Sequence, residues 1–545
     1  MYLTGSEIVV RILMEQGCDT VFGYPGGQVL DIYDSLYKHR KSIKHILTAH
    51  EQGAAHAADG YARATGKVGV VIATSGPGAT NLVTGIANAY MDSVPMVAIC
   101  GNVSTTQIGT DSFQEVDITG ITVPITKYNF FVKRIEDLAD AVRRAFVLAK
   151  TGRPGPVLVD IPKDIQTAKI AFSEAAKTVE SVAFAAKDVR IEEAAALINS
   201  AKRPLIYFGG GLVNSGAEEE MMDLARITDA PIACSMMGIS AIPSDYPGFL
   251  GMQGVHGHLA ATLAMQKADV IVALGVRFND RVTGDRNRFA LKTKVVHIDI
   301  DGSELAKTVD EAVSLRGDLK LTLNKLLPLL EKNEKPAWRK HIEELKAKEK
   351  EQSDKRTGFT PYRIMQTLNG FIGKNTPVAT DVGQHQVWAA QELKFSSPRR
   401  FLSSGGLGTM GYGLGASIGA YFGTGERGLL ITGDGSFGMS LNELATAVTY
   451  KVPVVIVIMD NGVLGMVRQM QTVHYKKRYS STVLDRKTDF AAIAKGFGAD
   501  GEKADSIEEL EAALMRASKA KGPYVIDCLI DKDEEVSYIM PSEES

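Results

Sequence analysis

Cysteine is scarce in this chain of 545 residues, which contains only four. The four are far apart and form no CxxC pair, so the sequence excludes a disulfide-stapled scaffold. We expect Cys18, Cys100, Cys234 and Cys528 to be buried as small apolar residues. The absence of an HExxH motif or a Cys/His cluster also argues against a zinc site.

An excess of one charge is also missing, because 61 Lys and Arg residues stand against 64 Asp and Glu residues. Proteins that bind nucleic acid usually carry a basic surplus or stripe, so nucleic acid is not an expected partner. No apolar run reaches the roughly 18 residues of a membrane-spanning helix. The first residues resemble neither a signal peptide nor a transit segment. We therefore expect a cytoplasmic protein with no membrane partner.

The composition, 45% apolar and 23% charged, is that of a soluble globular protein with several cores. Two polar breaks, near residues 166–188 and 332–357, divide the chain into blocks of single-domain size. We predict domains at 1–165, 190–330 and 358–545. The charged run inside the second break predicts a solvated linker helix with i,i+4 ion pairs.

Short apolar runs alternate with helical patterns in every block. The runs at 68–74, 269–275 and 453–458 are rich in β-branched residues and end in Gly or Asp, as expected for strands buried on both faces. This alternation predicts an α/β protein with three doubly wound, parallel-sheet domains. Residues 68–99 and 427–458 also share the order strand, glycine loop, helix, Val-Pro, strand. That echo indicates that the outer domains share a topology and that the middle one differs.

The strongest chemical signal is Gly433-Asp434-Gly435-Ser436, followed one strand–helix–strand crossover later by Asp460-Asn461. Both segments are expected at the carboxyl ends of neighbouring strands, where open α/β sheets bind ligands. Asp434 and Asn461 would supply hard oxygen ligands of the kind that Mg²⁺ takes together with phosphates. Gly435 would let the backbone approach an anion near a helix N-terminus. The pattern predicts a metal–diphosphate anchor.

This pattern resembles the binding motif of thiamine-diphosphate enzymes, in which Asn-Asn is usual where this chain has Asp460-Asn461. The resemblance implies that the metal ligands are Asp434, Asn461 and the backbone carbonyl of Val463, so the departure at Asp460 should cost little. It also implies a carboxylate against the aminopyrimidine ring, which shifts the ring to its imino form. Glu51 matches that position by its surrounding residues.

Nearly the whole chain resembles the catalytic large subunits of acetohydroxyacid synthase, also called acetolactate synthase. The segments that carry this resemblance are Phe22–Gly27, Ser75–Asn81, Ser112–Glu115, Arg153–Asp164, Gly275–Gly284, Gly405–Gly411 and Gly465–Gln469. Several are common to the thiamine superfamily, whereas the Ser112–Glu115 and Gly275–Gly284 blocks are much more specific. The family implies three domains: an N-terminal pyrimidine-binding domain, a central FAD-associated domain and a C-terminal diphosphate-binding domain.

The resemblance implies roles for individual residues. Around the reacting carbons it places Glu51, Phe113, Gln114, Lys163, Gly26 and Gly27. On thiamine diphosphate it places Glu51, Gln384, His385, Gly408, Met410, Asp434, Gly435, Ser436, Asn461 and Met466, with Met410 as the apolar wedge that keeps the cofactor bent. Against FAD it places Arg153, Gly209, Gly210, Gly211, His256, Gly275, Arg277, Arg281, Asp299 and Asp318. Asn279 stands where Asp is expected, which could weaken one flavin contact without abolishing binding.

The reaction implied is decarboxylation of pyruvate and its ligation to a second pyruvate or to 2-ketobutyrate, giving 2-acetolactate or 2-aceto-2-hydroxybutyrate for branched-chain amino-acid biosynthesis. Such a transferase must orient two substrates and exclude stray protons. The flavin has no net redox role in this scheme. Pyruvate oxidase, or another FAD-containing thiamine carboligase, is the alternative, and the two specific blocks argue against the oxidase. Glyoxylate carboligase is disfavoured because its family lacks a carboxylate at the position of Glu51. A non-catalytic relative would be expected to lose Glu51, Asp434 or Asn461.

One departure bears on substrate choice, since Met470 stands where these synthases usually carry Trp. In the family that Trp, together with the position of Arg281, contributes to acceptor specificity, and the Trp also contacts herbicidal inhibitors. Methionine is smaller and more flexible, so we expect weaker preference for 2-ketobutyrate and lower inhibitor sensitivity. The resemblance further implies a homodimer or tetramer with active sites at subunit interfaces, and a small regulatory subunit as partner.

Overall fold

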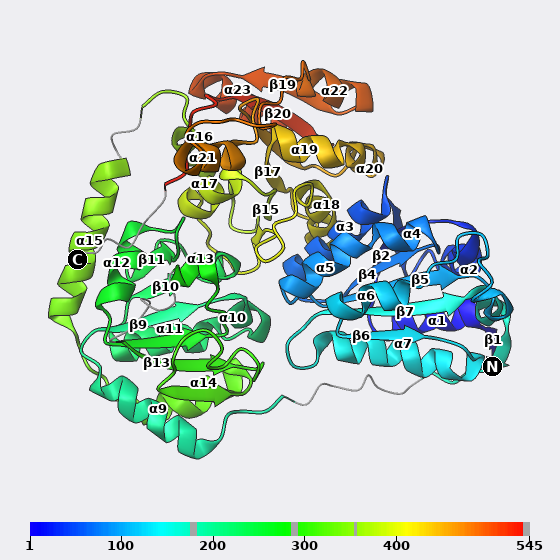
Figure 1. Cartoon of the computed structure of the whole chain (residues 1–545), viewed down its shortest axis with the longest axis horizontal. Coiled ribbons are helices and arrows are strands. Elements are labelled where there is room, and N and C mark those ends of the chain that lie inside the picture. The colour runs from blue at the N-terminus through cyan, green and yellow to red at the C-terminus, as the bar shows by residue number, and fades with distance from the viewer. Residues whose placement is uncertain (175–182, 285–292, 354–356, 538–545) are drawn as a thin grey trace.

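The structure is a computed structural model that describes residues 1–174, 183–284, 293–353 and 357–537. Figure 1 shows three lobes, each built on one six-stranded sheet. Every strand pair within these three sheets is parallel, and helices cover them. The predicted fold class, three doubly wound α/β domains, is confirmed. The exact domain bounds 1–165, 190–330 and 358–545 stay a prediction.

The N-terminal sheet has the strand order β3-β2-β4-β5-β7-β6. Its strands are β2 (Thr20–Tyr24), β3 (Lys44–Leu47), β4 (Gly69–Ala73), β5 (Met96–Asn102), β6 (Tyr128–Phe131) and β7 (Pro156–Pro162). Its helices are α1 (Gly5–Glu15), α2 (Leu30–Lys38), α3 (Glu51–Thr65), α4 (Pro77–Asn81), α5 (Val83–Met91), α6 (Ile118–Thr122), α7 (Ile135–Lys150) and α8 (Lys163–Thr167). All five residues of β4 are buried, because helices cover both faces of a parallel sheet. A small antiparallel pair, β1 (Tyr2–Thr4) with β8 (Lys169–Ala171), completes this domain.

The C-terminal sheet has the order β16-β15-β17-β18-β20-β19. Its strands are β15 (Val378–Thr380), β16 (Phe401–Leu402), β17 (Leu429–Gly433), β18 (Val455–Asp460), β19 (Asp500–Ala504) and β20 (Tyr524–Leu529). Its helices are α16 (Pro361–Asn369), α17 (Gln384–Glu392), α18 (Gly413–Thr424), α19 (Asp434–Ser440), α20 (Leu444–Thr449), α21 (Gly465–His474), α22 (Phe490–Phe497) and α23 (Ile507–Ala517). Counted along the chain, both outer sheets have the order 2-1-3-4-6-5. The predicted likeness of the outer domains is therefore confirmed.

The central sheet differs, as predicted, with the order β11-β10-β9-β12-β13-β14. Its strands are β9 (Pro204–Phe208), β10 (Ile232–Cys234), β11 (Phe249–Met252), β12 (Val270–Leu274), β13 (Lys294–Asp299) and β14 (Val313–Arg316). Its helices are α9 (Asp188–Ser200), α10 (Gly210–Ser215), α11 (Glu218–Thr228), α12 (Leu259–Lys267), α13 (Asp280–Thr283) and α14 (Leu319–Leu326). The order 3-2-1-4-5-6 is that of dinucleotide-binding folds, with its switch point between β9 and β12.

The outer domains meet through α3 and α18, which pack backbone against backbone. A Cβ atom added at Gly419 would lie 1.8 Å from the Ala57 carbonyl oxygen, and one at Gly60 would lie 2.1 Å from that of Ala416. Only glycine allows helices to approach so closely. This contact fixes α3, which begins at Glu51, against the C-terminal domain.

The predicted linker helix exists as α15 (Pro336–Ser353), but it is not simply solvated. Trp338 and Ile342 are buried against the central domain, and the Trp338 indole donates to the Pro204 carbonyl at 3.0 Å. The Glu349 carboxylate accepts from the backbone N–H of Leu259, at the start of α12, at 2.8 Å. The predicted helix is confirmed and most of its side chains are exposed, but one apolar stripe, which the prediction of a solvated helix did not include, anchors it to the central domain.

All four cysteines are buried, as predicted. Among the described residues, none of the helices has the length and apolar content needed to cross a membrane.

Candidate active site

Two carboxylates and an amide meet at one edge of the C-terminal sheet. Asp434 opens α19 directly after β17, Asp460 ends β18, and Asn461 follows it. Because β17 and β18 are paired neighbours, the Asp434 and Asp460 carboxylates lie together, as the spacing predicted, and Asn461 is the next residue along the chain. Burial and the neighbouring Asp460 carboxylate raise the pKa of Asp434. A cation bound there would relieve that repulsion, so the donor set fits a magnesium ion.

The turn after Asn461 is ordered by local hydrogen bonds. The Asn461 Oδ1 atom accepts from the backbone N–H of Val463 at 3.1 Å. Gly462 between them has φ +64°, a left-handed conformation that favours glycine. Val463 is itself held by an isolated bridge to Val483. A cavity of about 130 Å³ lies beside Asp434 and Asp460 and is also lined by Arg486, a residue that the sequence analysis did not single out.

His385, on the neighbouring helix α17, carries a buried nitrogen without a partner. Its Nε2 atom has no hydrogen-bond partner within the part of the chain that the structure describes. Burial lowers its pKa to about 3, so the ring is neutral at physiological pH. An orphaned buried polar atom costs about 1–3 kcal/mol, and a ligand that pairs with it would offset that cost. Such an atom at the strand ends marks a place where a ligand group would find a hydrogen-bonding partner.

The remaining candidates for contact with thiamine diphosphate are Gln384, Gly408, Met410, Gly435, Ser436 and Met466. The Met410 methyl group is 3.6 Å from where a Cβ of Gly435 would stand, and the Ser436 hydroxyl donates to the Val382 carbonyl at 3.1 Å. The Gln384 amide donates to Gln469 Oε1 at 3.0 Å. Gly408 and Met466 line a larger cavity next to it.

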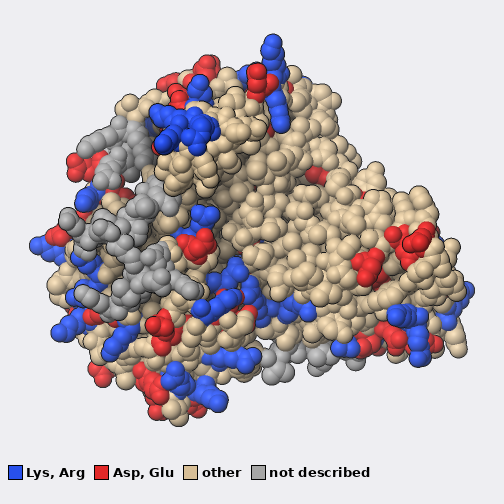
Figure 2. Space-filling model, in the orientation of Figure 1, with Lys and Arg blue, Asp and Glu red and all other residues tan. Residues whose placement is uncertain are grey.

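That larger cavity, of about 1200 Å³, lies between the three domains. All ten predicted flavin residues line it: Arg153, Gly209, Gly210, Gly211, His256, Gly275, Arg277, Arg281, Asp299 and Asp318. Its volume exceeds that of ordinary small-molecule pockets. Four of the described residues that line it, Arg153, Arg277, Arg281 and Arg316, are arginines, which pair well with phosphates. The residues therefore fit a dinucleotide such as FAD. In Figure 2 Lys and Arg side chains border the hollow beside the central domain.

The glycines at the mouth of β9 allow two loops to touch. A Cβ at Gly211 would lie 2.6 Å from the Gly275 Cα atom, and Gly275 itself has φ +52°. The ends of β9 and β12 are therefore in close contact at these glycines. Of the acidic candidates, Asp299 has its pKa raised by burial, and Asp318 caps α14 by accepting from the backbone N–H of Leu321 at 2.9 Å.

A second cluster of predicted residues lies on the N-terminal domain. Glu51 is buried, and its Oε2 accepts from the Asn81 amide at 2.9 Å. The Oε1 atom lies 3.3 Å from where a Cβ of Gly78 would stand. The residues before Glu51 are held by Glu443 of the C-terminal domain, whose carboxylate accepts from the backbone N–H groups of Ala49 at 3.2 Å and His50 at 3.0 Å. Neither Asn81 nor Glu443 was predicted from the sequence as a contact of this site.

The loop that carries Phe113 and Gln114 is ordered and strained. Gln114 has φ +62°, which is uncommon outside glycine and typical of functional loops. The Glu115 carboxylate accepts from the Ser112 backbone N–H at 2.9 Å and thereby closes the loop. Phe113 is 84% exposed. The Lys163 ammonium pairs with Asp31 and donates to the Gly27 carbonyl at 3.1 Å, so it is not the plain surface charge that its position alone would suggest.

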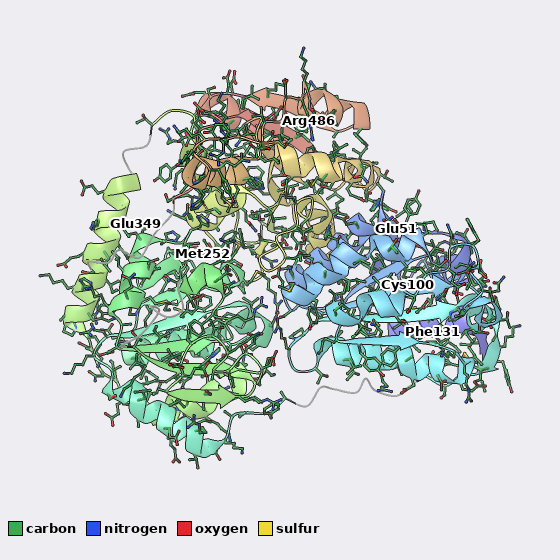
Figure 3. The ribbon with its side chains drawn as sticks, viewed as in Figure 1. Glu51, Cys100, Phe131, Met252, Glu349 and Arg486 are labelled. Carbon is green, nitrogen blue, oxygen red and sulfur yellow. The ribbon has the colours of Figure 1, made fainter. Side chains whose placement is uncertain are left out.

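Within one chain these two clusters remain apart. None of Glu51, Gly27, Phe113, Gln114 and Lys163 lines either cavity described above. Figure 3 shows Glu51 on the N-terminal domain and Arg486 on the C-terminal domain. Arg486 lines the cavity beside Asp434. The structure thus assembles the predicted residues into two half-sites.

Three family profiles match successive parts of the chain. They are the N-terminal TPP binding domain of thiamine pyrophosphate enzymes at residues 3–121, the central domain at 191–326 and the C-terminal TPP binding domain at 381–528. The fold is that of a thiamine pyrophosphate enzyme.

Curated relatives narrow this class. The chain is 44% identical to the probable acetolactate synthase large subunit of Methanocaldococcus jannaschii, over 99% of this chain and 94% of that one. It is also 44% identical to the acetolactate synthase isozyme 2 large subunit of Escherichia coli, over 99% and 98% of the two chains. For the acetolactate synthase large subunit of Corynebacterium glutamicum the identity is 43%, over 98% and 88%. The chain belongs to the acetolactate synthase large-subunit family, and its reaction class is thiamine-diphosphate-dependent carboligation. The predicted family and enzyme class are confirmed.

Proposed function

We propose that the chain binds thiamine diphosphate, Mg²⁺ and FAD, decarboxylates pyruvate, and joins the remaining two-carbon unit to a second pyruvate or to 2-ketobutyrate. The observation that carries this proposal is the pair of half-sites, one built around Glu51 and the other around Asp434 and Asn461. We place the activity in branched-chain amino-acid biosynthesis in the cytoplasm. A small regulatory subunit is its expected partner.

In this proposal the C-terminal half-site holds the metal and the diphosphate. Asp434, Asn461 and the Val463 carbonyl would bind Mg²⁺, and the buried His385 Nε2 would face the diphosphate. When bound, thiamine diphosphate supplies the electron sink for loss of carbon dioxide from pyruvate. Met410 packs beside Gly435 as the apolar support for the cofactor.

The N-terminal half-site would manage protons and substrates. Glu51, in a buried position fixed by Asn81, would hold a proton against the pyrimidine ring. A Cβ at Gly27 would meet no atom within 4 Å, which leaves room for a reacting carbonyl beside it. Lys163 and Gln114 would orient the second 2-ketoacid or its developing negative charge, while Phe113 would exclude water.

A second copy of the chain would complete each site. The loop with the strained Gln114 leaves the Phe113 ring 84% exposed, and a second copy of the chain would cover it. We propose a homodimer, or a dimer of dimers, in which Glu51 of one chain faces Asp434 of the other.

The central cavity would hold FAD without net redox chemistry. Arg153, Arg277 and Arg281 would bind the phosphates of FAD. The glycines at the end of β9 would allow FAD to approach the protein backbone closely. Pyruvate oxidase chemistry is the alternative for a flavin in this place.

The proposed function predicts a specific product pattern. The purified chain, given pyruvate, is expected to release acetolactate and carbon dioxide only when thiamine diphosphate, Mg²⁺ and FAD are all present. Quantifying both products while each cofactor is omitted in turn measures this. Carbon dioxide without acetolactate, accompanied by flavin reduction or acetaldehyde, would identify an oxidase or decarboxylase instead.

Met470 predicts the acceptor preference. It lies on α21, is 49% exposed and lines the large cavity. A tryptophan ring at this position would make more contact with the ethyl group of 2-ketobutyrate than the methionine side chain does. With both acceptors present, a Met470→Trp variant is expected to shift the ratio toward acetohydroxybutyrate by about tenfold relative to the native chain. Met515→Trp, at a 63% exposed position on α23, is the matched control. A native chain that already strongly prefers 2-ketobutyrate would contradict this prediction.

A further inference from the structure

Residues 91–93, the segment Met91-Asp92-Ser93, lie where the three domains meet. Met91 is the last residue of α5 in the N-terminal domain, and Asp92 and Ser93, which follow it, line the large cavity. Ser93 has φ +59°, a conformation that persists only where surrounding contacts hold it. Each of the three residues accepts a hydrogen bond from another part of the chain.

Asp92 connects this segment to the loop that carries the thiamine candidates. Its carboxylate accepts from the backbone N–H groups of Gly405 at 3.0 Å and Gly406 at 2.7 Å. The Asp92 side chain is fully buried and is also paired with Arg63 at 2.9 Å. Gly405 and Gly406 belong to the loop of residues 403–412, between β16 and α18, which also contains Gly408 and Met410.

The rest of the 403–412 loop is anchored on the same buried network. The Ser404 hydroxyl donates to Asn88 Oδ1, and the Tyr412 hydroxyl donates to Asp59 Oδ1 at 2.7 Å. Asp59 in turn pairs with Arg63. The position of Met410 therefore depends on carboxylates that lie outside its own domain.

The neighbours of Asp92 connect the same segment to the flavin cavity. The Met91 carbonyl accepts from the Arg277 guanidinium at 2.8 Å, and the Ser93 hydroxyl accepts from Arg153 Nε at 2.8 Å. Arg277 and Arg153 both line the cavity that fits FAD. Arg153 Nη1 is also paired with Asp301 at 3.3 Å and with Glu304 at 2.9 Å. A phosphate bound by Arg153 and Arg277 would add to these contacts and so further restrain the backbone on both sides of Asp92.

We propose that residues 91–93 couple the flavin cavity to the 403–412 loop, with Asp92 as the positioning residue. A ligand in the cavity restrains Arg153 and Arg277, and these restrain Ser93 and Met91. Asp92, between them, then holds the backbone of Gly405 and Gly406. This keeps Met410, in the same loop, in position to contact thiamine diphosphate. The inference rests on the proposed function and gives the flavin a structural role in this enzyme. Because linkage is reciprocal, each cofactor must tighten the binding of the other by the same factor.

The test is a binding cycle that needs no turnover. Calorimetry on the full chain gives the Kd of thiamine diphosphate with Mg²⁺ when FAD is absent and when FAD is saturating, and the Kd of FAD in the converse pair. We expect FAD to tighten thiamine diphosphate by at least about fivefold, with the same factor in reverse. In Asp92→Asn, which leaves Arg63 paired with Asp59, this coupling factor is expected to fall below about twofold.

A second variant breaks the same contact from the other side. A Cβ at Gly406 would lie 2.7 Å from Asp92 Oδ1, so Gly406→Ala should also abolish the coupling while keeping the Asp92 charge. Gly496→Ala, where a Cβ meets no atom within 4 Å, is the matched control and should retain the native factor.

The outcomes distinguish failure of the coupling through residues 91–93 from failure of the proposed function. A native chain that binds both cofactors independently, or coupling that survives in both Asp92→Asn and Gly406→Ala, overturns the role of residues 91–93 and leaves the proposed function standing. A chain that binds no FAD overturns both.

Discussion

Replacing Glu51 by Gln is expected to lower the rate of acetolactate formation by about 10²–10⁴-fold, the range for loss of a general acid or base. Glutamine keeps the size of the side chain and can still accept the hydrogen bond from Asn81. It cannot hold a proton against the pyrimidine ring, so the loss would arise in chemistry and not in folding. Steady-state kinetics with pyruvate measures the effect.

Two further measurements make this prediction specific. The Kd of thiamine diphosphate should change little in Glu51→Gln, because the diphosphate and metal ligands lie in the other half-site. Glu511→Gln, at an exposed position on α23, is the matched control and should retain the native rate. Near-native acetolactate formation by Glu51→Gln would remove this residue from the mechanism.

Much of the architecture could be predicted because its signals are local. The strands β4 and β12 are uninterrupted apolar runs, and β18 is apolar up to its last residue, Asp460. Asp434 and Asn461 directly follow β17 and β18, two strands of one sheet. The shared topology of the outer domains could be predicted for the same reason, since a glycine loop and a Val-Pro pair mark equivalent points in each.

The contacts between domains could not be predicted in this way. Asp92 meets Gly405 and Gly406, and Glu443 meets the start of α3, across more than 300 residues of chain. No spacing rule connects such positions, because only the docked fold brings them together. Arg63 likewise pairs with Asp92, outside its own helix, as well as with Asp59 four residues before it.

The linker helix shows the opposite case: the sequence contains a signal for burial, but the many charged residues around it favoured the prediction of a solvated helix. The charged run around α15 predicted a solvated helix, yet Trp338 and Ile342 stand four residues apart on one face. Apolar residues at that spacing define a buried stripe, and both are buried in the structure. The residues of the half-sites were predicted by family resemblance and not from local pattern. How the half-sites come together could not be predicted, and in a single chain Glu51 lines neither cavity.

Asp434→Asn is expected to lose at least about 100-fold in activity, because removal of a carboxylate from a metal site costs several kcal/mol. The amide keeps the volume of a buried side chain and removes its charge. Binding of Mg²⁺ and thiamine diphosphate should weaken in parallel. This variant is inactive for a different reason from Glu51→Gln, and the two lesions lie in different half-sites.

Mixing these two inactive chains tests the central claim, that each active site joins Glu51 of one copy to Asp434 of another. If the chains exchange freely after co-refolding or co-expression, about half of the dimers are hybrids, and each hybrid has one site with both native residues. The mixture is then expected to regain about a quarter of the native rate of acetolactate formation. A mixture that stays as inactive as its components, although hybrid dimers are isolated from it, would place both residues in one chain's site and contradict the account.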